Sequence, residues 1–429
     1  MAKEKKEKAT SVTDDIFSKL IDAGNSVTPG STKLGSQMDS EITTWINTGS
    51  LLLNMILSNK EDGGWPCGRV IQMFGQQSIG KSTLSYVAIR EAQAMGGISI
   101  YGDIEHAASE KFMKMLGVDM DRVIWFDTPD LEDCFEQIER YLKIIIDSGR
   151  PKNGKPSIII LDSIDALMPK SEVEGGFEFN MNVSMMKAKQ LHKMLRKINI
   201  FLNKANCCLF AISQIKDNTT GYGPNFQISG GNALPFWASI RVYLKGKEKI
   251  IARDANAENE YQEALARYKV EKKSNPKLEK PERSKASDVT IGYTVTAYTI
   301  KNKTAPPDRT AHFDIIFTEG LKDENCYFQY LLDYGAIKKD GTARYKIVAW
   351  ENDHGSFFKT AWLTDVLSDY DTYERVKKYL VDKLTYKVRD NSGMSISSEP
   401  LKDEEKEILE ELKAEYSKQE QLPEEYEQD

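Results

Sequence analysis

Gly75-Gln76-Gln77-Ser78-Ile79-Gly80-Lys81-Ser82-Thr83 is a complete G-x-x-x-x-G-K-[ST] sequence. This pattern is typical of a loop that binds nucleotide phosphates, provided that a strand precedes it and a helix follows it. The run 69–74 is short, apolar and β-branched, which indicates a strand, and the run 84–95 carries helix-forming residues at helical spacing. The sequence therefore predicts a strand, a phosphate-binding loop and a helix in succession.

Each part of this loop has an expected role. Glycine tolerates backbone conformations that a β-carbon forbids, so successive N–H groups can point at phosphate oxygens. Lys81 is expected to reach the β- and γ-phosphates of ATP, and the Ser82 hydroxyl to bind Mg²⁺. The alternative, a chance glycine-rich turn, does not explain why the flanking elements also agree. The residues expected to bind the nucleotide are Gly75, Gln76, Gln77, Ser78, Ile79, Gly80, Lys81, Ser82 and Thr83.

The composition is that of a folded protein without a membrane segment. The chain has 429 residues, of which 40% are hydrophobic and 29% charged. No apolar run approaches the roughly 18 residues that a membrane span needs, and the mixed-charge start has no apolar segment of a signal peptide. The five cysteines form no C-x-x-C pair, which favours buried thiols in a reducing compartment, the cytoplasm.

The net charge of −7 is unevenly distributed along the chain. Residues 401–429 contain twelve acidic and four basic residues, so the remaining 400 residues are close to neutral. A near-neutral body can still carry a local basic face, and the overall charge does not exclude a nucleic-acid partner.

Strand-like runs at 97–105, 122–126, 156–162 and 207–213 alternate with helix-like runs. This alternation predicts an α/β fold with a mostly parallel central sheet and helices on both faces. The later runs 290–302 and 311–317 predict an antiparallel hairpin at one edge of the sheet.

Four domains are expected. Residues 1–42 form an N-terminal tail with an amphipathic helix that ends at Gly24 and packs either on its own core or on the next copy of the protein. The further domains are the core at 43–322, with a charged helical insertion at about 245–285, a small α-rich domain at 323–389, and an acidic tail at 390–429.

Two carboxylates end neighbouring strands at the edge where α/β proteins bind ligands. Asp162 is expected to support Mg²⁺, the alternative being an N-cap for the following helix. Glu105 is placed where it could deprotonate the water that attacks the γ-phosphate.

A long polar loop is expected from Ile215 to Asn232. Its glycines, with Lys216, Tyr222 and Phe226, suit contact with nucleic-acid phosphates and stacking on bases. A solvated surface loop is the alternative interpretation.

Taken together, these motifs resemble the RecA family of recombinases over roughly residues 43–320. The resemblance is carried by the loop at 75–83, Asp103-Ile104-Glu105-His106-Ala107, Leu161-Asp162-Ser163, 168–175, Gln214, Gly230-Gly231-Asn232-Ala233-Leu234, Ala238-Ser239-Ile240-Arg241 and Lys301-Asn302-Lys303. They occur in the family's order and at its spacing.

The resemblance implies a protein that polymerises on single-stranded DNA with ATP between protomers, searches double-stranded DNA for homology and exchanges strands. By its motifs, Glu105 and Lys81 would be catalytic, Gln214 would sense the γ-phosphate, and Lys301 and Lys303 would act on the ATP of the adjacent protomer. Phe112 would stack on adenine, while Phe236 and the N-terminal helix would join protomers. The implied DNA-binding residues are Gly175, Gly176, Lys216, Tyr222, Phe226, Gly230, Gly231 and Asn232.

The sequence departs from the family pattern in places. Ser109 stands where the family usually has an aspartate, Ser213 replaces an asparagine, and the insertion at 245–285 has no counterpart. These departures fit a phage-encoded member similar to the UvsX proteins as well as a bacterial one. Either would work in a bacterial cell, with a single-strand-binding protein and a loader as further partners.

Two other functions share some of these motifs. A hexameric helicase has the same type of loop and sheet, but would be expected to carry a finger arginine and to lack the Gly-Gly-Asn sequence. A nucleotide-switched scaffold would bind ATP without hydrolysing it, and the presence of Glu105, Lys81 and Asp162 argues against this function.

Overall fold

The computed structural model describes residues 16–28, 31–34, 42–150, 155–173, 181–217, 226–228, 233–286, 288–351, 354–386 and 402–420. The chain divides into two units, residues 1–43 and 44–429. In the first unit, residues 16–27 are helical, so the helix does not end at Gly24 as the sequence suggested. Among the described helices, none is both long and apolar enough to cross a membrane.

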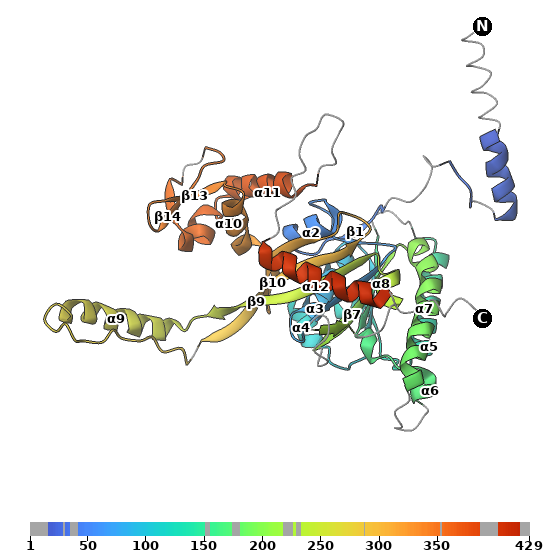
Figure 1. The fold of residues 1–429 in the computed structure, drawn as a ribbon, viewed down its shortest axis with the longest axis horizontal. Coiled ribbons are helices and arrows are strands. Elements are labelled where there is room, and N and C mark those ends of the chain that lie inside the picture. The colour runs from blue at the N-terminus through green and yellow to red at the C-terminus, as the bar shows by residue number, and fades with distance from the viewer. Residues whose placement is uncertain are drawn as a thin grey trace, which may run out of the picture. The chain divides into compact units, whose positions relative to one another are not determined.

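The second unit is built on a ten-stranded sheet (Figure 1). It is preceded by β1 (Trp45–Ile46), α2 (Leu51–Ser58) and β2 (Trp65–Pro66). The mostly parallel part comprises β3 (Val70–Gly75), α3 (Lys81–Ala94), β4 (Ile98–Asp103), α4 (Glu110–Met115), β5 (Val123–Phe126), α5 (Leu131–Asp147), β6 (Ser157–Asp162), α6 (Lys170–Val173), α7 (Met181–Lys204) and β7 (Cys207–Asp217). It continues with β8 (Phe226–Ile228), α8 (Ala233–Trp237), β9 (Ile240–Ala252), α9 (Ala255–Glu271), β10 (Val289–Asn302), β11 (Arg309–Ile316) and β12 (Gly320–Lys322).

The strand order is β12-β11-β10-β9-β3-β7-β6-β4-β5, with β8 paired to β7 alone. The strands from β9 to β5 pair in parallel, whereas β10, β11 and β12 add antiparallel pairs at one edge. This arrangement confirms the predicted fold class.

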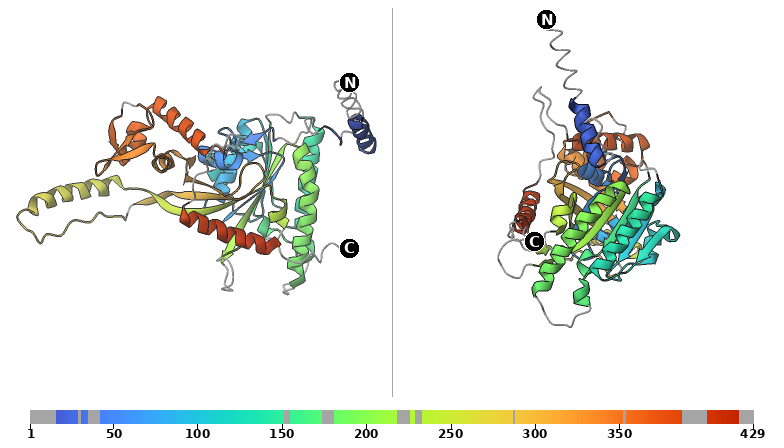
Figure 2. Two further views of the ribbon diagram at one scale, coloured as in Figure 1. Left: turned by 45° about the horizontal axis from the view of Figure 1, so that its top comes forward. Right: turned by 90° about the vertical axis from the view of Figure 1, so that its right-hand side faces the viewer.

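Helices cover both faces of the sheet because alternate residues of each buried strand point to opposite sides. In β3, Ile71 and Met73 pack in the layer that includes α2 and α3, whereas Val70 packs in the layer that includes α5, α7 and α8. Figure 2 shows these two helical layers from the side. Burial on both faces explains why these strands are continuous apolar runs without alternation.

A third, smaller cluster involves the C-terminal helix α12 (Asp403–Glu420). Ile408, Leu409 and Leu412 are buried against Phe74, Tyr243 and Tyr298 of the sheet. Glu405 is also buried, and one of its carboxylate oxygens lies 3.0 Å from His312 Nε2. Part of the acidic tail is therefore packed on the sheet through an apolar stripe.

The charged insertion is partly strand and partly helix. β9 pairs with β3 only as far as Leu244, but its pairing with β10 continues to Ala252 and Val289. Residues 245–252, the start of the insertion, are therefore strand, and α9 follows them, close to the helical run that the sequence indicates at 258–272.

The region after Asp323 contains helices, as expected, and also a small sheet that the sequence analysis did not predict. Its elements are α10 (Glu324–Asp333), β13 (Ile337–Asp340), β14 (Arg344–Ile347), β15 (Ser356–Phe358) and α11 (Tyr370–Leu384). The three strands pair in antiparallel order, each only three or four residues long.

Asp323 ties this region to the core. Its carboxylate is buried and accepts a hydrogen bond from Leu52 N at the start of α2 (3.1 Å). Burial raises the pKa of Asp323 to about 7, although hydrogen bonds from Ser50 and the backbone oppose this shift.

This raised pKa predicts a pH-dependent stability. The folded protein keeps the Asp323 proton up to about pH 7, whereas the unfolded chain loses it near pH 4. Between these values the folded state binds more protons, so the free energy of unfolding falls as the pH rises. In urea denaturation at pH 5 to 8, Asp323→Asn should therefore gain stability relative to wild type with increasing pH. A constant difference between the two proteins would contradict this assignment.

Candidate nucleotide-binding site

The two glycines of the loop at 75–83 are required for separate steric reasons. A β-carbon on Gly75 would lie 2.5 Å from the carbonyl oxygen of Leu244. Gly80 has φ of +98°, and a β-carbon there would lie 2.4 Å from Ile315 Cδ1. The loop backbone therefore packs directly on β9 and β11, and α3 begins at the next residue, Lys81, with its first N–H groups available for an anion.

Lys81 is buried and points back into this loop. Its Nζ donates hydrogen bonds to the carbonyl oxygens of Gly75 (2.9 Å) and Gln76 (2.7 Å). Burial lowers the pKa of Lys81, while the charges of Asp162, Glu105 and Asp165 oppose this effect. The ammonium group is thus held beside the loop backbone, where it can bind a phosphate, and the three carboxylates favour its charged form.

Ser82, Asp162 and Tyr101 converge from α3, β6 and β4. The hydroxyls of Ser82 and Tyr101 both donate to Asp162 Oδ2, at 2.7 and 2.8 Å. Burial raises the pKa of Asp162, and these two hydrogen bonds oppose the rise by favouring the carboxylate.

This hydroxyl and carboxylate are oxygen ligands of the kind that Mg²⁺ prefers. Within the described part of the chain, no group of three or more His, Cys, Asp or Glu side chains could hold a metal ion. The residues therefore fit a Mg²⁺ ion that shares its coordination with nucleotide phosphates and water rather than an ion held by protein alone.

Glu105 and Gln214 meet at the end of the sheet. Gln214 Nε2 lies 2.9 Å from Glu105 Oε1 and 3.1 Å from Oε2, and the Ser163 hydroxyl donates to the same carboxylate. The run 97–105 had suggested that Glu105 belongs to the strand. In the structure β4 ends at Asp103, so Glu105 lies in the turn that follows.

Several residues at this site were not singled out from the sequence. Asp103 accepts hydrogen bonds from Ala107 N (3.1 Å) and Ala108 N (3.4 Å), which holds the turn that carries Glu105. Asp165 accepts one from Gln214 N (2.7 Å). The sequence feature that could have identified Asp103 is its place at the end of a strand-like run, because it pairs there with Asp162 of the adjacent parallel strand.

Phe112 lies on α4 beside the buried Tyr86, at 5.9 Å between ring centroids. Tyr86 in turn contacts Tyr101 at 5.7 Å. Ser109, the departure from the family pattern, caps α4 by accepting a hydrogen bond from Phe112 N. Aromatic rings thus extend from the Asp162 site to the expected adenine-binding residue.

Lys301 and Lys303 lie elsewhere on the same chain. Lys301 pairs with Arg241 of β9, which in turn pairs with Gln72 of β3. Gln72 precedes Gly75 by about 10 Å along the strand, at roughly 3.3 Å per residue. Its Nζ donates to the carbonyl oxygens of Pro235 (2.6 Å) and Phe236 (3.0 Å). The structure does not bring these lysines to Glu105.

These two lysines instead line a separate cavity of about 570 Å³. Phe236, Trp237 and Arg69 line it as well, and the Phe236 side chain is 58% exposed. The cavity combines three cations with an exposed aromatic ring.

Most of the expected DNA-binding residues lie outside the described residues: Gly175, Gly176, Tyr222, Gly230, Gly231 and Asn232. Lys216 belongs to β7 and Phe226 to β8, which pair in antiparallel order. The expected loop from Ile215 to Asn232 therefore begins with a strand extension, because β7 runs on to Asp217.

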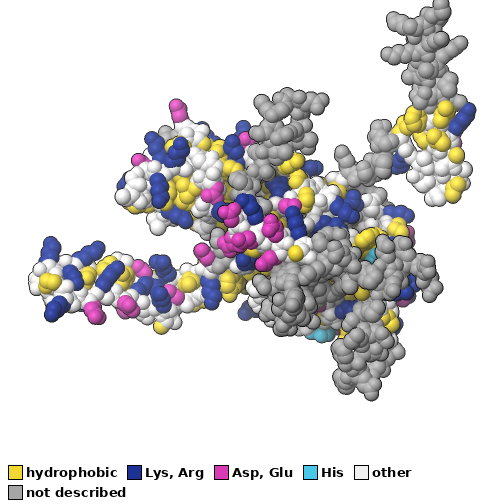
Figure 3. All heavy atoms as spheres, in the orientation of Figure 1, with side chains coloured by type: hydrophobic (Ala, Val, Ile, Leu, Met, Phe, Trp, Pro, Cys, Tyr) yellow, Lys and Arg dark blue, Asp and Glu magenta, His cyan; other side chains and the backbone are white. Residues whose placement is uncertain are grey.

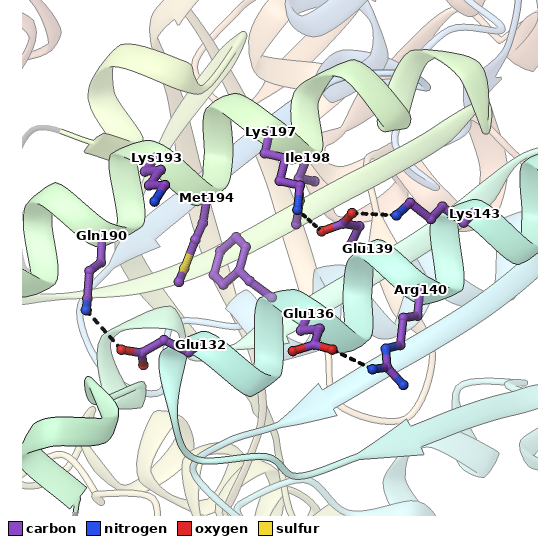
Figure 4. A pocket seen from close by; sticks show the side chains of 11 residues that line it. Glu132, Glu136, Glu139, Arg140, Lys143, Gln190, Lys193, Met194, Lys197 and Ile198 are labelled. Carbon is purple, nitrogen blue, oxygen red and sulfur yellow. Dashed lines mark hydrogen bonds and ion pairs between the residues drawn. The ribbon is translucent and has the colours of Figure 1, made fainter.

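A cavity of about 620 Å³ between α5 and α7 does not belong to this site (Figure 4). Its charged side chains largely pair with each other: Glu139 lies 2.7 Å from Lys143 and 2.6 Å from Lys197, and Glu136 binds Arg140. Few charges remain available to bind a ligand there.

Known proteins of one family are similar to this chain over most of its length. Residues 23–276 match the RecA N-terminal domain. Protein RecA of Helicobacter hepaticus is 30% identical over 94% of this chain and 99% of its own length. Protein RecA of Campylobacter fetus is 31% identical over 84% and 88%, and that of Sulfurimonas denitrificans 35% over 69% and 72%. The chain belongs to the RecA family.

Proposed function

We propose that this protein is an ATP-dependent recombinase that assembles on single-stranded DNA and exchanges strands with a homologous duplex. It would work in a bacterial cell, as a bacterial or phage-encoded protein. The observation that carries the proposal is the hydrogen bond between Gln214 and Glu105. It joins the carboxylate beside the phosphate loop to the strand that leads into the expected DNA-binding loop.

The proposed hydrolysis uses groups that already lie together. Lys81 and the N–H groups at the start of α3 would bind the phosphates, and Glu105 would accept a proton from the attacking water. When bound at Ser82 and Asp162, Mg²⁺ would supply positive charge against the phosphate oxygens. Loss of the γ-phosphate would remove a partner of Gln214 and free its amide for Glu105, which links hydrolysis to β7.

The position of Lys301 and Lys303 supports assembly of several copies. They are too far along the sheet to act on their own phosphate loop, yet they form a cationic cavity next to the exposed Phe236. A head-to-tail assembly would place this cavity against the phosphate loop of the next copy. The ATP would then be bound between protomers.

Strand exchange is the direct test of this function. A circular single strand and a homologous linear duplex should form joint molecules only with ATP and only when the sequences are homologous. ATP hydrolysis that single-stranded DNA stimulates, without any joint molecules, would contradict strand exchange and favour a motor. No ATP hydrolysis, either with or without single-stranded DNA, would favour a nucleotide-switched scaffold.

Glu105→Gln should bind ATP and DNA but hydrolyse ATP about 10² to 10⁴ times more slowly, because the general base is lost. Single-turnover hydrolysis and nucleotide binding, measured side by side, separate the two effects. Glu110→Gln is the matched control, since Glu110 is exposed on the nearby α4 and pairs with Lys114, its one ion-pair partner within the described residues. Normal turnover in Glu105→Gln would remove Glu105 from the catalytic role.

Lys301→Ala/Lys303→Ala should abolish DNA-stimulated hydrolysis when every copy carries it. Mixed with an equal amount of Lys81→Ala, it should recover activity at about a quarter of the interfaces, because a head-to-tail contact takes its two halves from different chains. Steady-state hydrolysis over a series of mixing ratios measures this recovery. Absence of recovery at every ratio, despite normal co-assembly, would contradict action between protomers.

A further inference from the structure

Residues 245–295 form an arm, comprising the β9–β10 extension, α9 and the return segment 272–288. The arm starts where β9 loses its pairing with β3, after Leu244. In the views of Figures 1 and 2, α9 and the return segment stand clear of the helical layers of the core. None of the residues of α9 is buried.

Polar contacts give α9 and the return segment a defined shape although none of their described residues is buried. The Asp254 side chain accepts a hydrogen bond from Ala257 N (2.7 Å) and so caps α9. Arg283 binds both oxygens of Asp288 at 2.7 Å and lies 2.8 Å from Glu258, which fastens the return segment to α9. α9 and the return segment are thus held in place without being buried against the core, so their surface remains available to a partner.

Charge is strongly polarised along the arm. The first part of α9, residues 254–263, has four acidic and no basic residues, whereas residues 264–285 have eight basic and three acidic ones. Figure 3 shows Lys and Arg side chains around the far end of the arm. Five exposed lysines there make no ion pair or side-chain hydrogen bond with any other part of the described chain: Lys269, Lys273, Lys277, Lys280 and Lys285.

The chemistry of this end favours a phosphate backbone over a protein surface. Protein interfaces depend on buried aromatic and arginine anchors, whereas here the large exposed apolar side chain is Val270 alone. Lysine is a mobile point charge that contacts phosphates without reading bases. A duplex presents about one negative charge per 1.7 Å of its axis, which suits a cluster of unpaired lysines.

We propose that the basic end of the arm binds the phosphate backbone of double-stranded DNA. This inference rests on the proposed function, because it makes the arm a contact for the duplex partner of strand exchange. It gives the insertion a role separate from that of the loops that follow Gln214.

The test replaces the five lysines by glutamine: K269Q/K273Q/K277Q/K280Q/K285Q. Since none of these side chains makes an ion pair or a hydrogen bond with the described part of the arm, the fold should remain, which far-UV circular dichroism can check. Binding of a fluorescent blunt duplex is measured over a salt series. The slope of log K against log salt should become shallower by about 0.9 for each lysine that contacts a phosphate, and by about 2 to 4 overall.

The matched control replaces the same five lysines by arginine, which keeps the charges and should keep both affinity and slope. Hydrolysis stimulated by a short single strand should be equal in all three proteins, because the substituted lysines lie on α9 and the return segment, which stand clear of the core in Figures 1 and 2. An unchanged slope and duplex affinity in the glutamine variant would overturn the proposal. So would a defect in self-assembly without DNA, which would indicate that the arm binds an acidic surface of another copy.

The two proposals can fail separately. Wild-type protein that binds duplex through the arm but shows no hydrolysis stimulated by single-stranded DNA would defeat the proposed function and leave the arm site intact. Normal strand exchange in the glutamine variant, with normal duplex binding, would defeat the arm site alone.

Discussion

The parallel pairing of four strands is the constraint on which this site depends. β3, β7, β6 and β4 are adjacent and parallel, and their register places Gly75 beside Gln214 and Asp103 beside Asp162. Asp162 is the last residue of β6, Glu105 follows the end of β4, and Gln214 lies on β7 beside the last residue of β3, so these groups meet at one edge of the sheet. A slip of one residue in any of these strands would exchange its two buried faces, so the hydrophobic packing that fixes the register also fixes the site.

The same register places the phosphate loop and the lysines of the cationic cavity at opposite ends of β3. Lys301 continues β10 towards the start of β3, and Lys303 follows it in the same direction, with its N–H bonded to Ser239 O. One chain thus presents a phosphate loop at one end and a cationic cavity at the other. Surfaces of this kind cannot meet within a monomer, and a head-to-tail contact repeated without closure generates a filament. Sheet geometry therefore supports the proposed assembly independently of family membership.

The sequence sufficed for the fold and for the existence of the strands around the site, because both depend on local apolar runs. It did not reveal Tyr101, whose place inside such a run is typical of a core residue, although its hydroxyl reaches Asp162. The extension of β7 through Lys216 and Asp217 depends on pairing with β8, a partner that no local pattern specifies. Similarly, the strands β13 to β15 are too short for alternation to distinguish them from loop.

The acidic composition of the tail did not indicate that α12 packs on the sheet, because a segment with net negative charge can still carry an apolar stripe. Burial of Ile408, Leu409 and Leu412 contributes roughly 1.5–3 kcal/mol each by transfer, whereas exposed ion pairs such as Lys413 with Asp308 contribute about 0–1 kcal/mol. Packing therefore dominates the docking of α12, and salt should affect it little.

Burial alone would raise the pKa of Glu405, but His312 and Lys402 N–H together hold it below its usual value, so this carboxylate docks as a charged group. The helix rests on Phe74, which precedes the phosphate loop, and Ile215, which follows Gln214, packs against the same cluster. The docked tail thus shares one apolar cluster with β3 just before the phosphate loop and with β7 just after Gln214.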